Sequence, residues 1–205
     1  KDYFVLTSNV DGCFERSGFD KNRIYTPQGD YGYLQCTSAC TRESVYDATP
    51  YFNKILPQIS DDGTIPEELI PTCPKCGSGL FGNVRGGSWF LSTKYVEQSN
   101  ELQNWMEAKI DSNQKVTAIE IGAGFNTPMV TRWPVESFVR ELGQTDRGTL
   151  VRINPSDPEV PSDLRSLSLA TGWQVLLDLK RGTECKEGSD LEKQVIKKQE
   201  LEGLR

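Results

Sequence analysis

Two short-spaced pairs of cysteines constrain this chain most. The first pair is Cys36 and Cys40, and the second, after a gap of 32 residues, is Cys73 and Cys76. A tetrahedral zinc ion needs four soft or imidazole ligands, and because the chain has no histidine, only thiolates can supply them. Gly77 lets the backbone fold beneath the second pair of sulfurs. The spacing predicts a closed, structural zinc site; the alternatives are a pair of disulfides, or cysteines that merely happen to be close in the sequence.

Composition and charge exclude several functional classes. The 205 residues, 36% hydrophobic and 25% charged, suffice for one core and a small further module. A net charge of −6 argues against nucleic acid as a partner, and no run approaches the ~20 apolar residues that cross a membrane. The other cysteines, Cys13 and Cys185, stand alone, which favours a cytoplasmic location. The absence of histidine removes the usual general base of neutral pH.

Outside the cysteine-rich region, strand-like segments alternate with helix-like ones. Such alternation, with small or polar residues after each strand, is typical of an α/β fold with a parallel sheet. Residues 1–32 and 90–181 would form this domain, residues 33–89 an inserted metal module, and residues 182–205 a charged tail. The predicted strands are 3–7 (buried on both faces), 116–121 and 150–153; the predicted helices are 97–111, about 134–142 and a short one starting at Ser162 or Asp163; 173–179 is a strand or a helix.

The residues that follow three of the strands are suited to ligand binding, because ligands sit beyond the carboxyl ends of parallel strands. These strand ends are 8–12, 122–126 and 154–156. Small residues let backbone amides approach phosphates, and Asn or Asp side chains can hold ribose hydroxyls. Two plainer interpretations remain open. Gly122, Ala123 and Gly124 can be a tight turn only, and Asn9 and Asp11 can form an Asx-turn that stabilises only the backbone.

The order of these motifs resembles the sirtuin family over roughly residues 3–180. Residues 7–12, Thr-Ser-Asn-Val-Asp-Gly, are similar to the sirtuin Thr-Gln-Asn-Val-Asp-Gly segment, and Gln28 stands where sirtuins have the catalytic histidine. The cysteine pairs match the zinc ribbon. Residues 122–124, Gly-Ala-Gly, match the Gly-Thr-Ser turn, and residues 150–154 are similar to the ribose-binding strand. These motifs in the same order are more specific than any one of them.

The resemblance implies a Rossmann-like sheet that binds NAD, with an inserted zinc module. Asn9, Asp11 and Gln28 would be the catalytic residues and would also contact the cofactor. Asp11 would hold the nicotinamide carboxamide, and Asn9 would order water or substrate near the ribose. The other predicted cofactor-binding residues are Gly122, Ala123, Gly124, Asn154, Gly172 and Trp173.

The chain departs from the sirtuin pattern in two places. The family's glycine-rich strand-turn-helix, which covers the NAD pyrophosphate, has no counterpart here, so we expect a fragment or one half of a split protein. Second, the amide of Gln28 cannot titrate near neutral pH, so it can orient a group but cannot deprotonate it.

A glutamine at this place, together with residues 120–126, resembles the macrodomain-associated microbial branch of the family. That branch implies a protein ADP-ribosyltransferase that uses NAD, with an acceptor protein and a macrodomain protein as partners. The alternatives are a sirtuin-type NAD-dependent protein deacylase and an inactive, zinc-stabilised interaction module.

Overall fold

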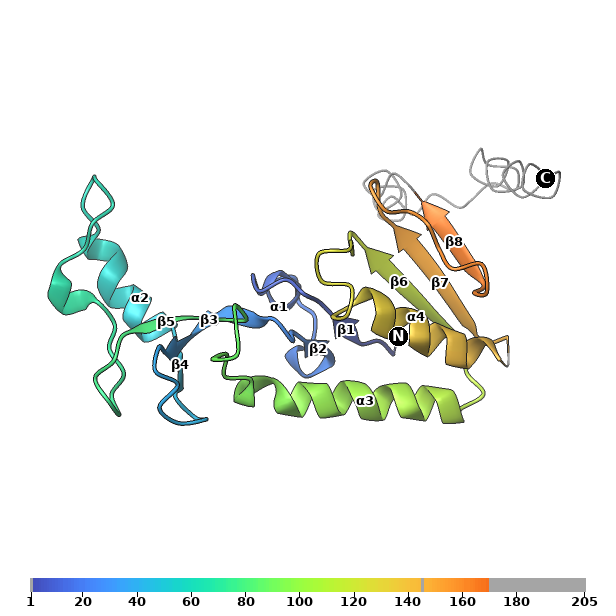
Figure 1. The fold of residues 1–205 in the computed structure, drawn as a ribbon, viewed down its shortest axis with the longest axis horizontal. Coiled ribbons are helices and arrows are strands. Elements are labelled where there is room, and N and C mark those ends of the chain that lie inside the picture. Colours follow the sequence, from blue (N-terminus) through green and yellow to red (C-terminus); the bar gives the residue numbers. More distant parts are fainter. Residues whose placement is uncertain (1, 145, 170–205) are drawn as a thin grey trace.

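The computed structural model describes residues 2–144 and 146–169, which form a mixed α/β structure (Figure 1). Within these residues the strands form three separate sheets, two of them parallel and one antiparallel. None of the described helices is long and apolar enough to cross a membrane. The predicted segment 173–179, the tail 182–205, Gly172 and Trp173 lie outside the described residues.

The larger parallel sheet has the strand order β6-β7-β8. Strand β6 (Val116–Ile121) and strand β7 (Gly148–Ile153) confirm the predicted strands, and helix α4 (Arg132–Gly143) confirms the predicted helix of about 134–142. Helix α4 packs on one face of this sheet (Figure 1). The core between them contains Val139, Leu150 and Leu164, with Ala118, Val135 and Val160 packed against it.

The prediction of a short helix that starts at Ser162 or Asp163 is wrong. These residues form a turn, and the chain then enters strand β8 (Ser166–Leu169), which pairs in parallel with β7. Two features explain the difference. Residues 166–169, Ser-Leu-Ser-Leu, alternate polar and apolar side chains, as a half-buried strand does, and the free edge of β7 offers backbone hydrogen-bond partners that a helix here would leave unused.

The strand expected over residues 3–7 is shorter and less buried than predicted. Strand β1 (Val5–Leu6) pairs in parallel with β2 (Ile24–Tyr25), and both are only half-buried. Among the described residues β1 has no strand on its other edge, so the apolar run is not enclosed on both faces. The short helix α1 (Cys13–Arg16) and the 3-10 turn η1 (Lys21–Arg23) lie between β1 and β2 in the sequence.

Helix α3 (Val96–Asp111), predicted as 97–111, connects the two parallel sheets. It contacts η1 and β2 on one side and α4 on the other (Figure 1). The Trp105 ring lies 6.2 Å from Phe4, just before β1, and 6.1 Å from Phe138 of α4. The short 3-10 turn η4 (Thr93–Tyr95) leads directly into this helix.

The cysteine-rich segment forms an antiparallel sheet in which β3 (Gly29–Cys36) lies between β4 (Val45–Asp47) and β5 (Leu80–Val84). Helix α2 (Thr49–Ile55) and the 3-10 turns η2 (Leu56–Gln58) and η3 (Glu67–Leu69) follow β4. The core of this part contains Leu34, Cys36, Ala48, Cys73 and Leu80. It is located at one end of the described molecule, remote from the β6-β7-β8 sheet (Figure 1).

Candidate functional site

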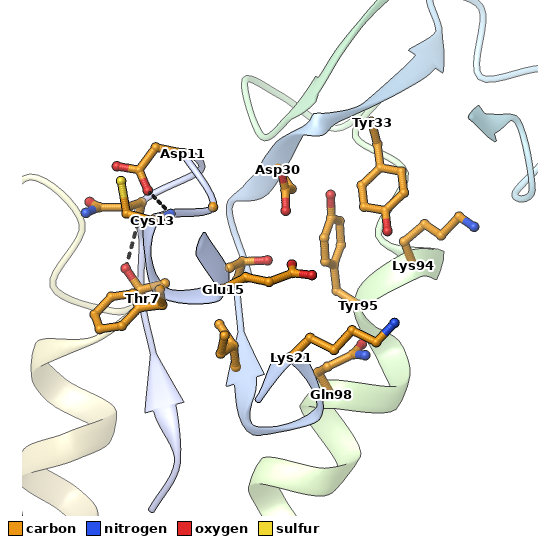
Figure 2. A pocket seen from close by; sticks show the side chains of 15 residues that line it. Thr7, Asp11, Cys13, Glu15, Lys21, Asp30, Tyr33, Lys94, Tyr95 and Gln98 are labelled. Atoms are coloured by element: carbon orange, nitrogen blue, oxygen red, sulfur yellow. Dashed lines mark hydrogen bonds between the residues drawn. The ribbon is translucent and has the colours of Figure 1, made fainter. Parts of the chain in front are cut away.

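A cavity of about 160 Å³ lies beside the carboxyl end of β1. Its lining comes from the β1 end, α1, β2, β3 and the start of α3, so segments far apart in the sequence meet there (Figure 2). Asn9 and Asp11 both line this cavity, as Thr7 does. The structure therefore brings together the two residues that the sequence singled out at the first strand end.

Local hydrogen bonds orient this strand end. The backbone N–H of Asn9 donates to Thr7 Oγ1 (3.1 Å), and that of Cys13 donates to Asp11 Oδ1 (2.9 Å). Gly12, between them, has φ 65°, which favours glycine. The hydrogen bonds from Cys13 and the nearby Arg16 guanidinium lower the pKa of Asp11, so its carboxyl is ionised at neutral pH. The Asp11–Cys13 contact has the i to i+2 pattern of an Asx-turn, so backbone stabilisation is one function of Asp11.

Gln28 is not part of the cavity lining. It lies half-buried in the turn between β2 and β3, where its backbone carbonyl accepts a hydrogen bond from the backbone N–H of Arg85 (2.9 Å). The following residue, Gly29, has φ 104°, and a Cβ there would lie 2.1 Å from the Asn83 carbonyl oxygen. The turn that carries Gln28 is therefore held tightly against β5.

At the second strand end, residues 122–124 and Asn154 form a closely bonded corner. Gly122 has φ 67°. The buried Asn154 donates its amide to the Ala123 carbonyl (3.0 Å), and its Oδ1 accepts from the backbone N–H groups of residues 156–157 (2.9 and 3.0 Å). A Cβ on Gly124 would lie 3.2 Å from Asp157 Oδ2. The Asn154 amide thus ties the end of β6 to the loop after β7, and its predicted contact with NAD stays a prediction.

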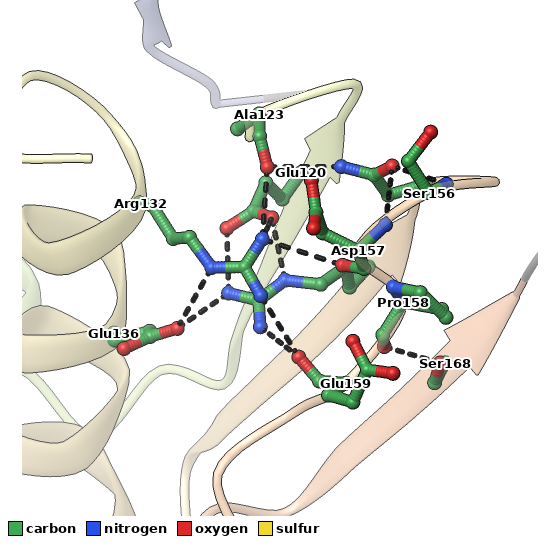
Figure 3. Close-up of polar contacts among 11 residues, drawn as sticks. Glu120, Ala123, Arg132, Glu136, Ser156, Asp157, Pro158, Glu159 and Ser168 are labelled. Carbon is green, nitrogen blue, oxygen red and sulfur yellow. Dashed lines mark hydrogen bonds and ion pairs between the residues drawn. The ribbon is translucent and has the colours of Figure 1, made fainter. Parts of the chain in front are cut away.

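A buried ion network that the sequence analysis missed lies below this corner (Figure 3). Arg152 is fully buried; its Nε lies 2.5 Å from Glu120 Oε1, and its NH2 lies 2.9 Å from Glu120 Oε2 and 2.5 Å from Glu136 Oε1. Arg132 approaches the same two carboxylates, at 4.0 and 3.7 Å. Glu120 and Arg152 occupy directly opposed positions of β6 and β7, a register that the sequence alone does not give.

Other residues of the cavity also escaped the sequence analysis: Glu15, Lys21, Asp30, Tyr33, Lys94, Tyr95 and Gln98. Figure 2 shows them around the side opposite Asp11 and Cys13. Tyr95 is buried, and its hydroxyl donates to Asn83 Oδ1 (2.5 Å), while burial and the neighbouring Asp30 raise the pKa of Tyr95 above its usual range. The three-residue spacing of Tyr95 and Gln98, which places both on one helix face, was the available signal.

The four predicted metal ligands come together at the base of the antiparallel sheet. Their sulfur atoms all lie within 4.8 Å of one another, with Cys36 and Cys76 at 3.5 Å and Cys40 and Cys73 at 3.8 Å. Tetrahedral zinc with Zn–S bonds of about 2.3 Å separates its sulfurs by about 3.8 Å. All four are free thiols, which contradicts the disulfide alternative. The donor set therefore fits zinc.

The surroundings of the cluster shift the pKa values of two of its thiols in opposite directions. The Tyr46 hydroxyl, 3.4 Å from Cys73 Sγ, is the main cause that lowers the pKa of Cys73 to about 6. The Ser44 hydroxyl also lowers the pKa of Cys40, but desolvation and the adjacent thiols outweigh it and raise that pKa to about 11. A cation bound among the four sulfurs would favour the thiolate form of all four, because the thiolate is the metal ligand.

Comparison with known proteins relates the chain to ADP-ribosyltransferases, although no family model matches it. It is 37% identical over 156 residues to a probable bifunctional ADP-ribose hydrolase/ADP-ribosyltransferase of Fusarium oxysporum f. sp. cubense, a match of 75% of this chain and 26% of that protein. It is 25% identical over 171 residues to a protein ADP-ribosyltransferase of Staphylococcus aureus, with 82% and 52% covered. The chain spans about a quarter and about half of these relatives.

Proposed function

We propose that this chain is the catalytic part of a sirtuin-like protein ADP-ribosyltransferase that uses NAD as the donor. The observation that carries the proposal is that Asn9 and Asp11 line one cavity in a chain related to two proteins named ADP-ribosyltransferase. The two parallel sheets, from residues 1–32 and 90–181, would belong to a Rossmann-like NAD-binding domain, with residues 33–89 as its zinc module.

The transfer needs a stabilised positive charge and an oriented nucleophile more than a strong base. The bond between the nicotinamide nitrogen and ribose C1′ breaks, and its electron pair leaves with nicotinamide. A bond forms between C1′ and a nucleophilic side chain of the acceptor protein, whose proton passes to solvent. The ionised carboxylate of Asp11 would oppose the charge that develops at C1′. Asn9 would order the acceptor beside C1′, and Gln28 would orient a hydroxyl from the neighbouring turn.

The four-thiolate cluster would hold one structural zinc ion. With all four positions taken by Cys36, Cys40, Cys73 and Cys76, no site remains for a substrate, so the metal would hold β3 and β5 in place. The partners in this proposal are an acceptor protein and a macrodomain protein in the cytoplasm. The name of the Fusarium relative, which joins an ADP-ribose hydrolase to a transferase, supports the second partner.

The test measures label transfer from NAD to protein and deacylation of an acyl-peptide side by side, in the full-length protein that contains this chain. We expect labelled protein and no deacylation. Asn9→Ala should lower transfer about 100-fold, and Gln28→Ala about 10-fold, because orientation at the reacting carbon is lost. Gln28→His would admit some deacylation. Efficient deacylation without labelled protein would replace the transferase by a deacylase, and no turnover of NAD would favour the inactive module.

A further inference from the structure

Arg132, at the start of α4, carries a buried guanidinium whose hydrogen bonds join two loops. The residue is 3% exposed. Its NH1 donates to the carbonyls of Ala123 (2.9 Å) and Asp157 (3.3 Å), and its NH2 donates to the carbonyl of Glu159 (3.0 Å). Ala123 follows β6, and the other two acceptors follow β7 (Figure 3). One side chain of α4 thus connects the ends of two neighbouring parallel strands.

Arg152 belongs to the same network, but its contacts are distributed differently. Its nitrogens lie within 2.9 Å of Glu120 and Glu136, whereas Arg132 approaches the same carboxylates only to 4.0 and 3.7 Å. Among the described contacts, Arg152 reaches only the loop after β7, at the Glu159 carbonyl. Arg152 is therefore the main partner of the two carboxylates, and Arg132 is the side chain that connects the two loops.

The contact with Ala123 also orients a peptide group at the end of β6. The Ala123 carbonyl accepts from both Arg132 and the Asn154 amide (2.9 and 3.0 Å). In a planar trans peptide the C=O and the next N–H point in opposite directions, so the N–H of Gly124 points away from the buried network. The guanidinium also lies 4.3 Å from the centre of the Phe125 ring, which is 60% exposed. Arg132 thus fixes the direction of this peptide and supports the ring that follows it.

The position of Arg132 in the fold indicates what this connection does. Ligands of parallel sheets lie beyond the carboxyl ends of the strands, and Arg132 lies directly behind two of these ends (Figure 3). Compensation of buried carboxylates does not require donors that are directed at loop carbonyls. A ligand that contacts both loops does require them at a fixed separation, because a misplacement of about 1 Å can cost about 100-fold in rate.

We propose that Arg132 is a positioning residue for the cofactor, which holds the loops after β6 and β7 in the arrangement in which they bind NAD. The inference rests on the proposed function. Arg132 is buried, so it acts through the two loops and not by contact with NAD. Its loss should weaken NAD binding. The chemical step, assigned to Asn9 and Asp11 after β1, should keep its rate once NAD is bound.

The experiment measures kcat and KM for NAD in the transfer reaction of the full-length protein, and the dissociation constant of NAD by calorimetry. Arg132→Met removes the donors and keeps a similar side-chain length, and Arg132→Lys keeps the positive charge without the planar fork of donors. Arg152→Met is a buried control from the same network. Arg140→Met is an exposed control on the same helix, where Arg140 pairs with Asp163. All measurements are made well below the thermal midpoints of the variants.

We expect Arg132→Met to raise KM and the dissociation constant at least about 10-fold and to leave kcat within about 2-fold of the parent. Arg132→Lys should recover only part of this loss, because one ammonium group cannot reach carbonyls on two loops. If Arg132→Met does not fold, Arg132→Lys decides alone, by a KM at least about 3-fold above that of the parent.

The controls distinguish positioning from stability. Arg152→Met should show the larger fall in thermal midpoint, because Arg132→Met leaves both carboxylates in contact with Arg152. Its KM should nevertheless stay within about 3-fold of the parent. Arg140→Met should match the parent in KM and in kcat. A purely structural role of Arg132 would not give this crossover, since KM would then follow the thermal midpoint.

An unchanged KM in Arg132→Met would overturn the inference, as would an equal rise of KM in Arg132→Met and Arg152→Met. A fall in kcat at unchanged KM, or full recovery by Arg132→Lys, would also overturn it. Calorimetry separates these failures from failure of the proposed function. Transfer that does not depend on Arg132 removes the inference alone, and Arg132-dependent binding of NAD without any transfer removes the proposed function alone. No binding of NAD by the parent would remove both.

Discussion

Removal of the buried Arg152 side chain should destabilise the β6-β7-β8 unit more than any surface change of the same kind. Arg152→Met keeps most of the aliphatic length. Of the described cations, it leaves Glu120 and Glu136 with Arg132 alone, whose contacts are 4.0 and 3.7 Å instead of 2.5 Å. Breaking a buried pair from one side costs about 3–5 kcal/mol, because an uncompensated charge stays behind. Since Arg132 compensates in part, we expect about 3 kcal/mol.

The assay is urea and thermal unfolding of the chain. For a chain of this size 1 kcal/mol shifts the midpoint by about 2–4 °C, so Arg152→Met should lower it by about 6–12 °C. Arg140→Met is the matched control, because Arg140 also forms an arginine–carboxylate pair (2.6 Å to Asp163) but on the surface, with side chains 45% and 55% exposed. Its loss should cost at most about 1 kcal/mol.

A double variant distinguishes charge burial from packing. Arg152→Met with Glu120→Leu removes both members of the bidentate pair and leaves Arg132 with Glu136. Replacing a buried ion pair by apolar groups is often neutral, so the double variant should lie within about 1 kcal/mol of the parent. A double variant as unstable as Arg152→Met, or a single variant no less stable than Arg140→Met, would refute the reasoning.

Two further predictions concern the cysteine-rich part. Elemental analysis of the purified protein should find one zinc per chain. Because metal binding is coupled to folding, removal of the zinc by a chelator, or Cys73→Ser, should speed amide hydrogen exchange in β3, β4 and β5 and leave β6 and β7 protected. Equally fast exchange in all of these strands would contradict this prediction. Gly29→Ala should destabilise the chain by more than about 2 kcal/mol in urea unfolding, since φ is 104° and the new Cβ meets the Asn83 carbonyl oxygen at 2.1 Å. Gly143→Ala should be tolerated, because, apart from its neighbours in the helix, no atom of the described residues lies within 4 Å of the new Cβ.

The elements that could be predicted from sequence are those whose residue pattern alone decides them. Helix α3 and helix α4 carry apolar residues at helical spacing, and β6 and β7 are short segments rich in apolar and β-branched residues that end at Gly122 and Asn154. The four cysteines were predictable because thiolates in a histidine-free chain have few other functions at that spacing. The length and the burial of strand β1 were overestimated, because an apolar run does not reveal how many neighbouring strands pair with it.

The site was less predictable than the fold, because it is assembled from distant segments. Asn9 and Asp11 follow a strand and could be identified from that position, but Gln98 is an ordinary residue in the first turn of an amphipathic helix. Within the described part of the chain its side-chain oxygen is buried without a hydrogen-bond partner, and this burial depends on how α3 packs against η1 and β2. Glu120 and Arg152 likewise become notable only when the register of β6 and β7 is known.

Strand β3 links the cluster of four thiols to the cavity. Near one end it supplies Asp30 and Tyr33 to the cavity lining, and at the other end it terminates in Cys36, one of the four clustered thiols. Between them, Gln35 is the fully buried partner of Asn83, which in turn holds Tyr95 at the start of α3. Strand β3 is thus continuous from the thiol cluster to the cavity, although its pairing with β5 changes register between Asp30 and Leu34. We expect a change at the four thiols to reach the cavity through β3 and the hydrogen bonds that join Gln35, Asn83 and Tyr95, and not by direct contact.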